Sequence, residues 1–225
     1  MIRSFSISFC TVSKSFRSHH LFLPQKAFPD EVLDLDKAVR TLDLTHNKLV
    51  DIPMEISKLI NLQRLVLADN LIERLPMNLG KLQSLKAMTL DGNRIASLPD
   101  ELGQLVRLER LSISDNILTC LPETIGSLRN LSLLNVSNNK LKTLPESIGS
   151  CFSLEELQAN DNLIEDLPAS VCNLIHLKSL SLNNNSVGQM EGFQEFEARR
   201  KSKFDKQIDS NVMMGSKGLD EGVDL

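Results

Sequence analysis

The 225-residue sequence predicts a repeat fold, in which short units that each contain one strand stack on one another. Three observations predict it. An asparagine recurs every 23 residues through most of the chain, an aliphatic residue follows it by two positions, and a proline follows further on. The chain also has no Trp and no Tyr, so leucine supplies most of its apolar mass.

The repeated unit reads LxxLxLxxNxL, and positions below are counted from its first residue. Its seven copies begin at Val39, Leu62, Leu85, Leu108, Leu131, Leu154 and Leu177. The ninth residue of each copy forms what we call the asparagine ladder: Asn47, Asn70, Asn93, Asn116, Asn139, Asn162 and Asn185. A spacing of 23 residues that is kept between every neighbouring pair indicates one regular stack.

Each unit contains a predicted strand and a predicted return segment. Apolar and polar residues alternate around LxL, as they do in a half-buried strand. After the asparagine the alternation stops, and an LPxxIxxL spacing brings the chain back across the far side. A single unit cannot bury its own leucines, so the next unit has to cover them.

The asparagine ladder has a predicted structural role. Where the strand ends and the chain turns inward, backbone N–H and C=O groups leave the strand ladder and would be buried without partners. A side-chain amide carries both donors and an acceptor, so one asparagine can satisfy several of these groups. We therefore expect the ladder to be structural and to have no catalytic role.

These motifs resemble the leucine-rich repeat family, in its 23-residue LxxLxLxxNxLxxLPxxIgxL class. The "Ig" of the pattern stands as Leu79–Gly80, Leu102–Gly103, Ile125–Gly126 and Ile148–Gly149. The sequence is most similar to the plant intracellular Ras-group-related subgroup. The resemblance implies an α/β repeat: a right-handed solenoid with a parallel β-sheet on its concave face. It also implies a cytoplasmic protein in intracellular signalling, with a small GTPase or a phosphatase as partner.

The seven repeats cover residues 39–190, and the segments before and after them differ from the repeats in composition. Residues 1–26 hold basic residues and serines but no acidic residue, so we expect a disordered leader or an organelle-targeting segment. Residues 27–38 resemble a partial repeat that caps the first full one. Residues 191–208 have the apolar spacing of an amphipathic capping helix, and 209–225 are expected to be a disordered tail. Glu191 stands where the next proline belongs, which favours a hypothesis that the chain is a truncated isoform.

Composition and motifs argue against several classes of function. The net charge of −4 argues against nucleic acid as the ligand, and the sequence has no apolar run long enough to span a bilayer. It also lacks GxGxxG, P-loop, HExxH and GxSxG motifs, and its four cysteines have no metal-binding spacing. We expect a monomeric, non-catalytic protein without a metal or a cofactor.

The remaining candidate site is the concave face. The third, fifth and seventh positions of each unit should point away from the core, and the eighth should lie near the end of the strand. The candidate partner-binding residues there are Arg64, Val66, Asp69, Asp91, Arg110, Asp115, Leu133, Asn135, Glu156, Gln158 and Asp161.

Two of these residues, Leu133 and Val66, are apolar on a face that should meet solvent. We interpret them as interface anchors that Arg64 and Arg110 flank. Two alternatives remain: the polar residues only keep the sheet soluble, or nearby aspartates tether the arginines. The predicted function is a protein–protein interaction scaffold, and the alternatives are a truncated isoform or a defence-associated ligand sensor.

Overall fold

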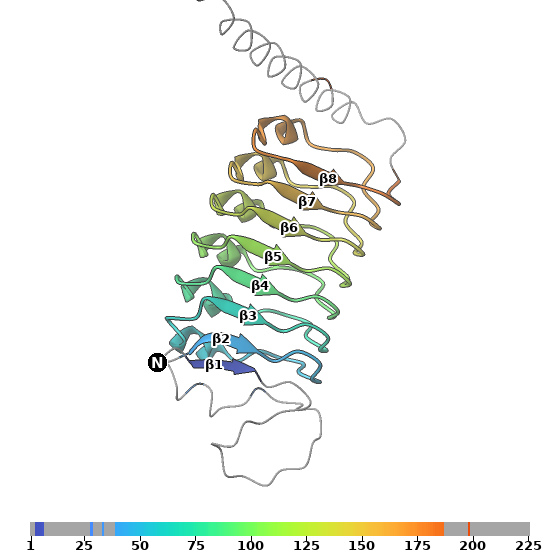
Figure 1. Cartoon of the computed structure of the whole chain (residues 1–225). Helices are drawn as coiled ribbons and strands as arrows, with labels where there is room; N and C mark the ends of the chain where they lie inside the picture. The colour runs from blue at the N-terminus through green and yellow to red at the C-terminus, as the bar shows by residue number, and fades with distance from the viewer. Residues whose placement is uncertain (1–2, 7–27, 29–32, 34–38, 187–197, 199–225) are drawn as a thin grey trace, which may run out of the picture.

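The computed structural model describes residues 3–6, 28, 33, 39–186 and 198, which form one open parallel sheet (Figure 1). The eight strands lie in chain order from β1 to β8. They are β1 Arg3–Ser6, β2 Val39–Asp43, β3 Arg64–Val66, β4 Ala87–Thr89, β5 Arg110–Ser112, β6 Leu133–Asn135, β7 Glu156–Gln158 and β8 Ser179–Ser181. The predicted repeat solenoid with a parallel sheet is confirmed.

The strand register follows the 23-residue spacing. From β2 onward, the third, fourth and fifth positions of each repeat pair with the same positions of the next. Arg110, for example, lies opposite Leu133, and Leu133 lies opposite Glu156. Residues that share a position in the repeat therefore form rows across the sheet.

The return segments are short 3₁₀-helices. They are η1 Met54–Lys58, η2 Met77–Lys81, η3 Asp100–Gln104, η4 Glu123–Ser127, η5 Glu146–Ser150 and η6 Ala169–Asn173. A proline stands before each one, and its carbonyl accepts the first 3₁₀ hydrogen bond, such as that from the Leu79 amide to Pro76 at 3.0 Å. Five residues allow little more than one turn, a length at which 3₁₀ geometry is common.

The core lies between the sheet and these 3₁₀-helices. Leucines and isoleucines from successive repeats fill it, and most are fully buried. Each buried side chain contributes roughly 1.5–3 kcal/mol before the entropy cost of ordering the chain is subtracted. The last described repeat is less well covered, because Leu177, Leu180 and Leu182 are only partly buried.

The chain ends differ from the sequence expectations where the structure describes them. Within the segment 1–26, which the composition indicates as a disordered leader or an organelle-targeting segment, residues 3–6 form β1, and β1 pairs in parallel with β2. In the predicted N-terminal cap, Phe28 and Leu33 are buried in the core. The remaining residues of the leader and cap lie outside the described part of the chain, as do the tail over 209–225 and, apart from residue 198, the helix predicted over 191–208.

Cys151 occupies a core position that leucine takes in the other repeats, such as Leu128 in the repeat before it. Its thiol is fully buried and donates to the carbonyl of Ile125 at 3.3 Å. Burial raises the pKa of the Cys151 thiol from 9.0 to about 11, because the thiolate would lose its hydration. The thiol should therefore stay protonated and unreactive near neutral pH.

This pKa shift predicts a pH dependence of stability. Above pH 9 the thiol ionises in the unfolded chain but not in the folded one, so the free energy of unfolding should fall between pH 9 and pH 11. The loss should reach about 2 kcal/mol, since a tenfold difference in ionisation corresponds to ~1.4 kcal/mol. Urea denaturation across this range should show the loss in the native protein and not in Cys151→Ser. If the free energy of unfolding fell equally in the native protein and in Cys151→Ser, the loss would come from groups other than Cys151.

Candidate functional site

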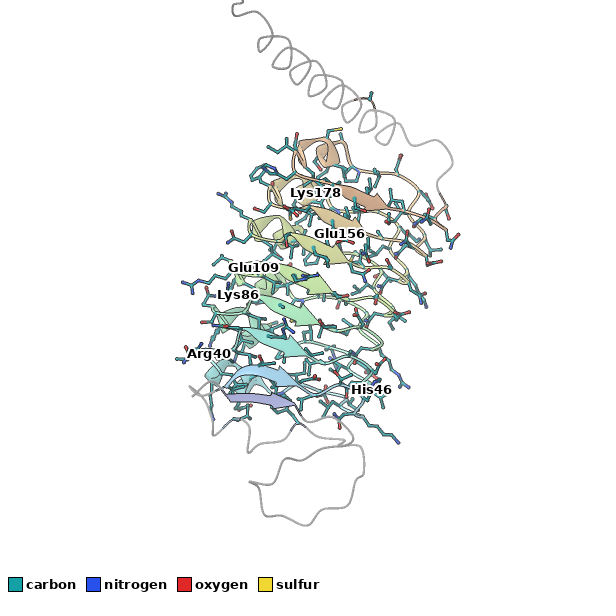
Figure 2. The ribbon with its side chains drawn as sticks, viewed as in Figure 1. Arg40, His46, Lys86, Glu109, Glu156 and Lys178 are labelled. Carbon is teal, nitrogen blue, oxygen red and sulfur yellow. The ribbon has the colours of Figure 1, made fainter. Side chains whose placement is uncertain are left out.

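The face of the sheet that points away from the core is the candidate site, and we call it the sheet face. Two rows form its centre. Row three consists of Thr41, Arg64, Ala87, Arg110, Leu133, Glu156 and Ser179, and row five consists of Asp43, Val66, Thr89, Ser112, Asn135, Gln158 and Ser181. All these side chains are partly or fully exposed. Figure 2 shows Glu156 on this sheet, with Lys86 and Glu109 at the edge where the strands begin and His46 at the opposite edge.

Row three brings together an apolar side chain and two opposite charges. Leu133 on β6 lies between Arg110 on β5 and Glu156 on β7, in direct register with both. Neighbouring strands are about 4.8 Å apart, so the three side chains lie next to one another. Arg110 is exposed and forms no ion pair with any described residue. We call these three residues the Leu133 cluster.

The other predicted anchor lies elsewhere on the face. Val66 is on β3, in row five, where Asp43 and Thr89 are its neighbours, so it and Leu133 are three strands apart. The residue between Arg64 and Arg110 in row three is Ala87, whose side chain is small. The two arginines therefore flank a small residue in row three. Arg110 lies beside Leu133 on the next strand, whereas Arg64 lies two residues before Val66 on β3.

Four polar candidates of the sheet face are bonded to their neighbours or to one another. Asp91 accepts from the Ser112 hydroxyl at 2.7 Å and from the Ser114 amide at 2.7 Å. Gln158 donates to Glu156, and Asn135 accepts from the Ser137 amide at 3.0 Å. The bonds of Asn135 and of Gln158 with Glu156 order polar side chains beside Leu133, whereas Asp91 lies two strands away. The bonds to Asp91 also mean that it is largely satisfied by the protein itself.

The eighth-position aspartates form a separate row at the edge where the strands end. Asp69 pairs with His46 at 3.1 Å, and Asp161 accepts from the Asn184 amide at 2.8 Å. Asp115 accepts from Asn138 in the same way. These contacts run between neighbouring repeats along the edge. The described contacts of Asp69 and Asp115 therefore do not tether Arg64 and Arg110, which was one of the alternatives from the sequence.

A backbone requirement explains which residue types stand in the eighth position. All seven residues there have positive φ: His46, Asp69, Gly92, Asp115, Asn138, Asp161 and Asn184. Gly, Asn, Asp and His tolerate this left-handed conformation better than other residues do. This signal was present in the sequence, because no other residue type occurs in the row. The three aspartates stay partner-binding candidates, but the turn alone is sufficient reason for them.

The asparagine ladder lies beneath this edge and joins each repeat to the one before it. In the central repeats, Asn93 accepts from the Ile72 amide at 3.0 Å and donates to the Leu67 carbonyl at 2.9 Å, both in the preceding repeat. It also donates to the carbonyl of Leu90 at 2.9 Å in its own repeat. Asn70, Asn116, Asn139, Asn162 and Asn185 bond in the same way. These contacts are with backbone groups, which is the structural role expected of the ladder.

The described residues contain no cluster of three side chains suited to hold a metal ion. Within the same part of the chain, no helix has the length and apolar character needed to cross a membrane. The sheet face presents two apolar side chains, Leu133 and Val66, together with charges of both signs and side-chain amides.

Known families match the chain over its repeats. A family described as "Leucine rich repeat" matches residues 37–95, and one described as "Leucine-rich repeat region" matches residues 77–161. Together the two matches run from residue 37 to residue 161, which is more than half of the chain. "Plant intracellular Ras-group-related LRR protein 7" of Oryza sativa subsp. japonica is 78% identical over 37 residues, 16% of this chain and 14% of the rice protein.

Solved structures share the fold. A leucine-rich repeat protein of Leptospira interrogans matches with a TM-score of 0.57 and 29% identity, over 75% of this chain and 49% of that one. The ectodomain of the Arabidopsis thaliana receptor kinase GASSHO1/SCHENGEN3 matches with a TM-score of 0.64 and 31% identity, over 71% of this chain and 20% of that one. The chain thus spans less than half the length of each of these relatives.

Proposed function

Because the chain is a leucine-rich repeat protein, we propose that it acts as a non-catalytic scaffold in intracellular signalling and binds a protein partner through its sheet face. The observation that carries the proposal is the Leu133 cluster. Leu133 is partly exposed, and Arg110 beside it forms no ion pair with any described residue. A leucine placed between this arginine and a glutamate has no evident role in folding, since row three faces away from the core. The sheet fixes the backbone positions of the three residues before any partner arrives, which lowers the entropy cost of binding.

The cluster defines the chemistry of a matching partner. An apolar side chain would cover Leu133, a carboxylate would pair with Arg110, and a cation would pair with Glu156. Arginine is one of the residue types enriched among the few central residues that contribute most of the binding energy in many complexes. Asn135 and Gln158, in the next row, would contribute hydrogen bonds at the rim.

The proposed setting is cytoplasmic signalling, with a small GTPase or a phosphatase as the partner. The name of the rice relative, which describes it as intracellular and Ras-group-related, supports this setting. The capture experiment below tests the partner class.

The test is affinity capture from the cells that express the protein, with a Leu133→Glu, Arg110→Glu double variant. We expect the native protein to capture a partner, and the double variant to bind it at least roughly 100-fold more weakly, since each substitution removes a central contact. Val106→Glu, Arg129→Glu is the matched control, because both residues are exposed and lie off the sheet face. Circular dichroism should show that both double variants are folded. A partner that the Leu133, Arg110 variant retains at full affinity would disprove this site.

A second candidate function is the recognition of a peptide ligand. The observation that favours it is the likeness to the Arabidopsis receptor ectodomain, whose structure was solved in complex with CASPARIAN STRIP INTEGRITY FACTOR 2. Peptidomic analysis of the same captured material separates the two candidates. A short peptide that depends on Leu133 would favour a sensor, whereas a folded protein would favour the scaffold.

A further inference from the structure

A second exposed surface runs along the edge of the sheet where the strands end. The tenth position of each repeat, directly after the ladder asparagine, forms it. We call this row the comb, and from the first repeat to the sixth it consists of Lys48, Leu71, Arg94, Ile117, Lys140 and Leu163. Basic and aliphatic residues alternate without exception over these six repeats, so the surface has a period of two repeats.

The fold does not require this alternation. In odd and even repeats alike, the tenth-position amide donates to the eleventh-position carbonyl of the preceding repeat, at 2.9 Å from Leu71, 2.9 Å from Arg94 and 3.2 Å from Ile117. The side chains do not fill the core either. Ile117 and Leu163 are 41% and 46% exposed, and the three basic residues are exposed.

Attraction within the protein does not explain the alternation. The aspartates of the same edge are bonded to other partners, namely His46, Asn138 and Asn184. Among the described residues, no ion pair involves Lys48, Arg94 or Lys140. Three cations and two well-exposed aliphatic residues are therefore available to another molecule.

The spacing of the comb residues indicates which secondary structure of a partner would match them. Its backbone bonds place successive comb residues about 4.8 Å apart, so like residues recur at roughly 10 Å. Along one face of an α-helix, side chains recur every three to four residues, about 5 Å, and every seventh residue returns after about 10.5 Å. An extended strand presents side chains on one face about 6.7 Å apart, which does not match the comb.

We propose that the comb is a docking surface for an amphipathic helix of a protein partner. The helix would carry aliphatic residues seven positions apart and a carboxylate midway between them. The aliphatic residues would pack on Leu71, Ile117 and Leu163, and the carboxylates would pair with the three cations. Six repeats extend over about 24 Å, which is the length of roughly 16 helical residues. The comb is distinct from the sheet face, so the proposal for one surface can be disproved while the proposal for the other holds.

The first test uses a synthetic stapled helical peptide of about 21 residues, with leucines seven apart and glutamates midway. Fluorescence anisotropy with the full chain should show binding. A control peptide of the same composition, with its leucines spread around the helix, should bind at least tenfold more weakly. Ile117→Glu, Leu163→Glu should weaken binding of the first peptide at least tenfold, whereas Leu133→Glu on the sheet face should leave it unchanged.

The second test reverses the charges. The double variant Arg94→Glu, Lys140→Glu should bind the glutamate peptide more weakly than the native protein does. It should bind more tightly a peptide in which lysines replace the glutamates. Such an exchange of preference requires the comb cations to face the carboxylates. The proposal is overturned if the glutamate peptide does not bind the native protein, or if the control peptide with dispersed leucines binds as tightly as the glutamate peptide. It is also overturned if the Ile117, Leu163 variant binds the glutamate peptide as the native protein does.

Discussion

Replacing Asn116 with alanine is expected to lower the free energy of unfolding by about 4 kcal/mol, since several buried backbone groups would lose their partners. Its Oδ1 accepts from the Ile95 amide at 2.9 Å, and its Nδ2 donates to the carbonyls of Leu90 at 3.0 Å and Ser114 at 2.9 Å. Ile95 and Leu90 belong to the preceding repeat, so the substitution weakens the junction between two repeats. Urea denaturation followed by circular dichroism measures the loss.

Asn185→Ala is the matched control for this prediction. Asn185 makes the same bonds, to the Ile164 amide at 3.0 Å and to the Ala159 and Leu182 carbonyls at 2.9 Å each, but it is only partly buried. Water can replace part of these bonds, so the expected loss is nearer 1 kcal/mol. Equal losses at the two positions, or a loss below about 1 kcal/mol for Asn116, would contradict the role of burial.

The position of Asn116 also predicts the shape of the unfolding transition. Stability in a stack of repeats is close to a sum of single-repeat and neighbour-interface contributions. Weakening one central interface should therefore broaden the transition or divide it into two steps. Asn185→Ala, in the last described repeat, should instead leave one main transition.

The repeats could be predicted from the sequence because a fixed spacing determines the register. Once units of 23 residues stack, residues that share a position become neighbours across the sheet. The adjacency of Arg110, Leu133 and Glu156 follows from this rule. The interpretation of Arg64 and Arg110 as a pair that flanks the anchors does not follow from this rule, because Ala87 separates them.

Other features of the site depend on the path of the backbone and on side-chain rotamers. The left-handed turn at the eighth position explains Asp115 without any ligand, and its bond to Asn138 depends on where both side chains point. The bond between Glu156 and Gln158 likewise follows from their rotamers. A consensus pattern does not contain such information, because it treats these positions as variable.

The comb and the strand over residues 3–6 are two further features that the repeat pattern alone does not predict. The alternation of Lys48, Leu71 and Arg94 is present in the sequence, but it becomes meaningful only when the tenth position is shown to lie at the surface, where Leu71 is partly buried and the two basic residues are exposed. The ends lack the 23-residue spacing, so no rule predicted that residues 3–6 would pair with β2.

Gly126→Ala is expected to lower the free energy of unfolding by about 3 kcal/mol, because it would force two 3₁₀-helices apart. Gly126 in η4 is buried against η5. A Cβ atom at this position would lie 2.5 Å from the carbonyl oxygen of Ser147 and 2.9 Å from its Cβ. The first of these contacts is with backbone, which no side-chain rotation can relieve. Gly80, Gly103 and Gly149 make the same kind of contact with the next 3₁₀-helix, so the steric limit applies along the stack.

Two substitutions separate this steric effect from other causes. Ser147→Ala, on the other side of the contact, should be nearly neutral, because the Ser147 hydroxyl is buried without a described hydrogen-bond partner. Gly92→Asn should cost less than about 1 kcal/mol, although Gly92 has a φ of 66°. A Cβ atom there would meet the Asp69 carboxylate, which can rotate, and Asn138 already adopts this conformation and bonds to Asp115. If Gly126→Ala proves as mild as Gly92→Asn in chemical denaturation, the 3₁₀-helices can separate easily and close stacking does not limit the fold.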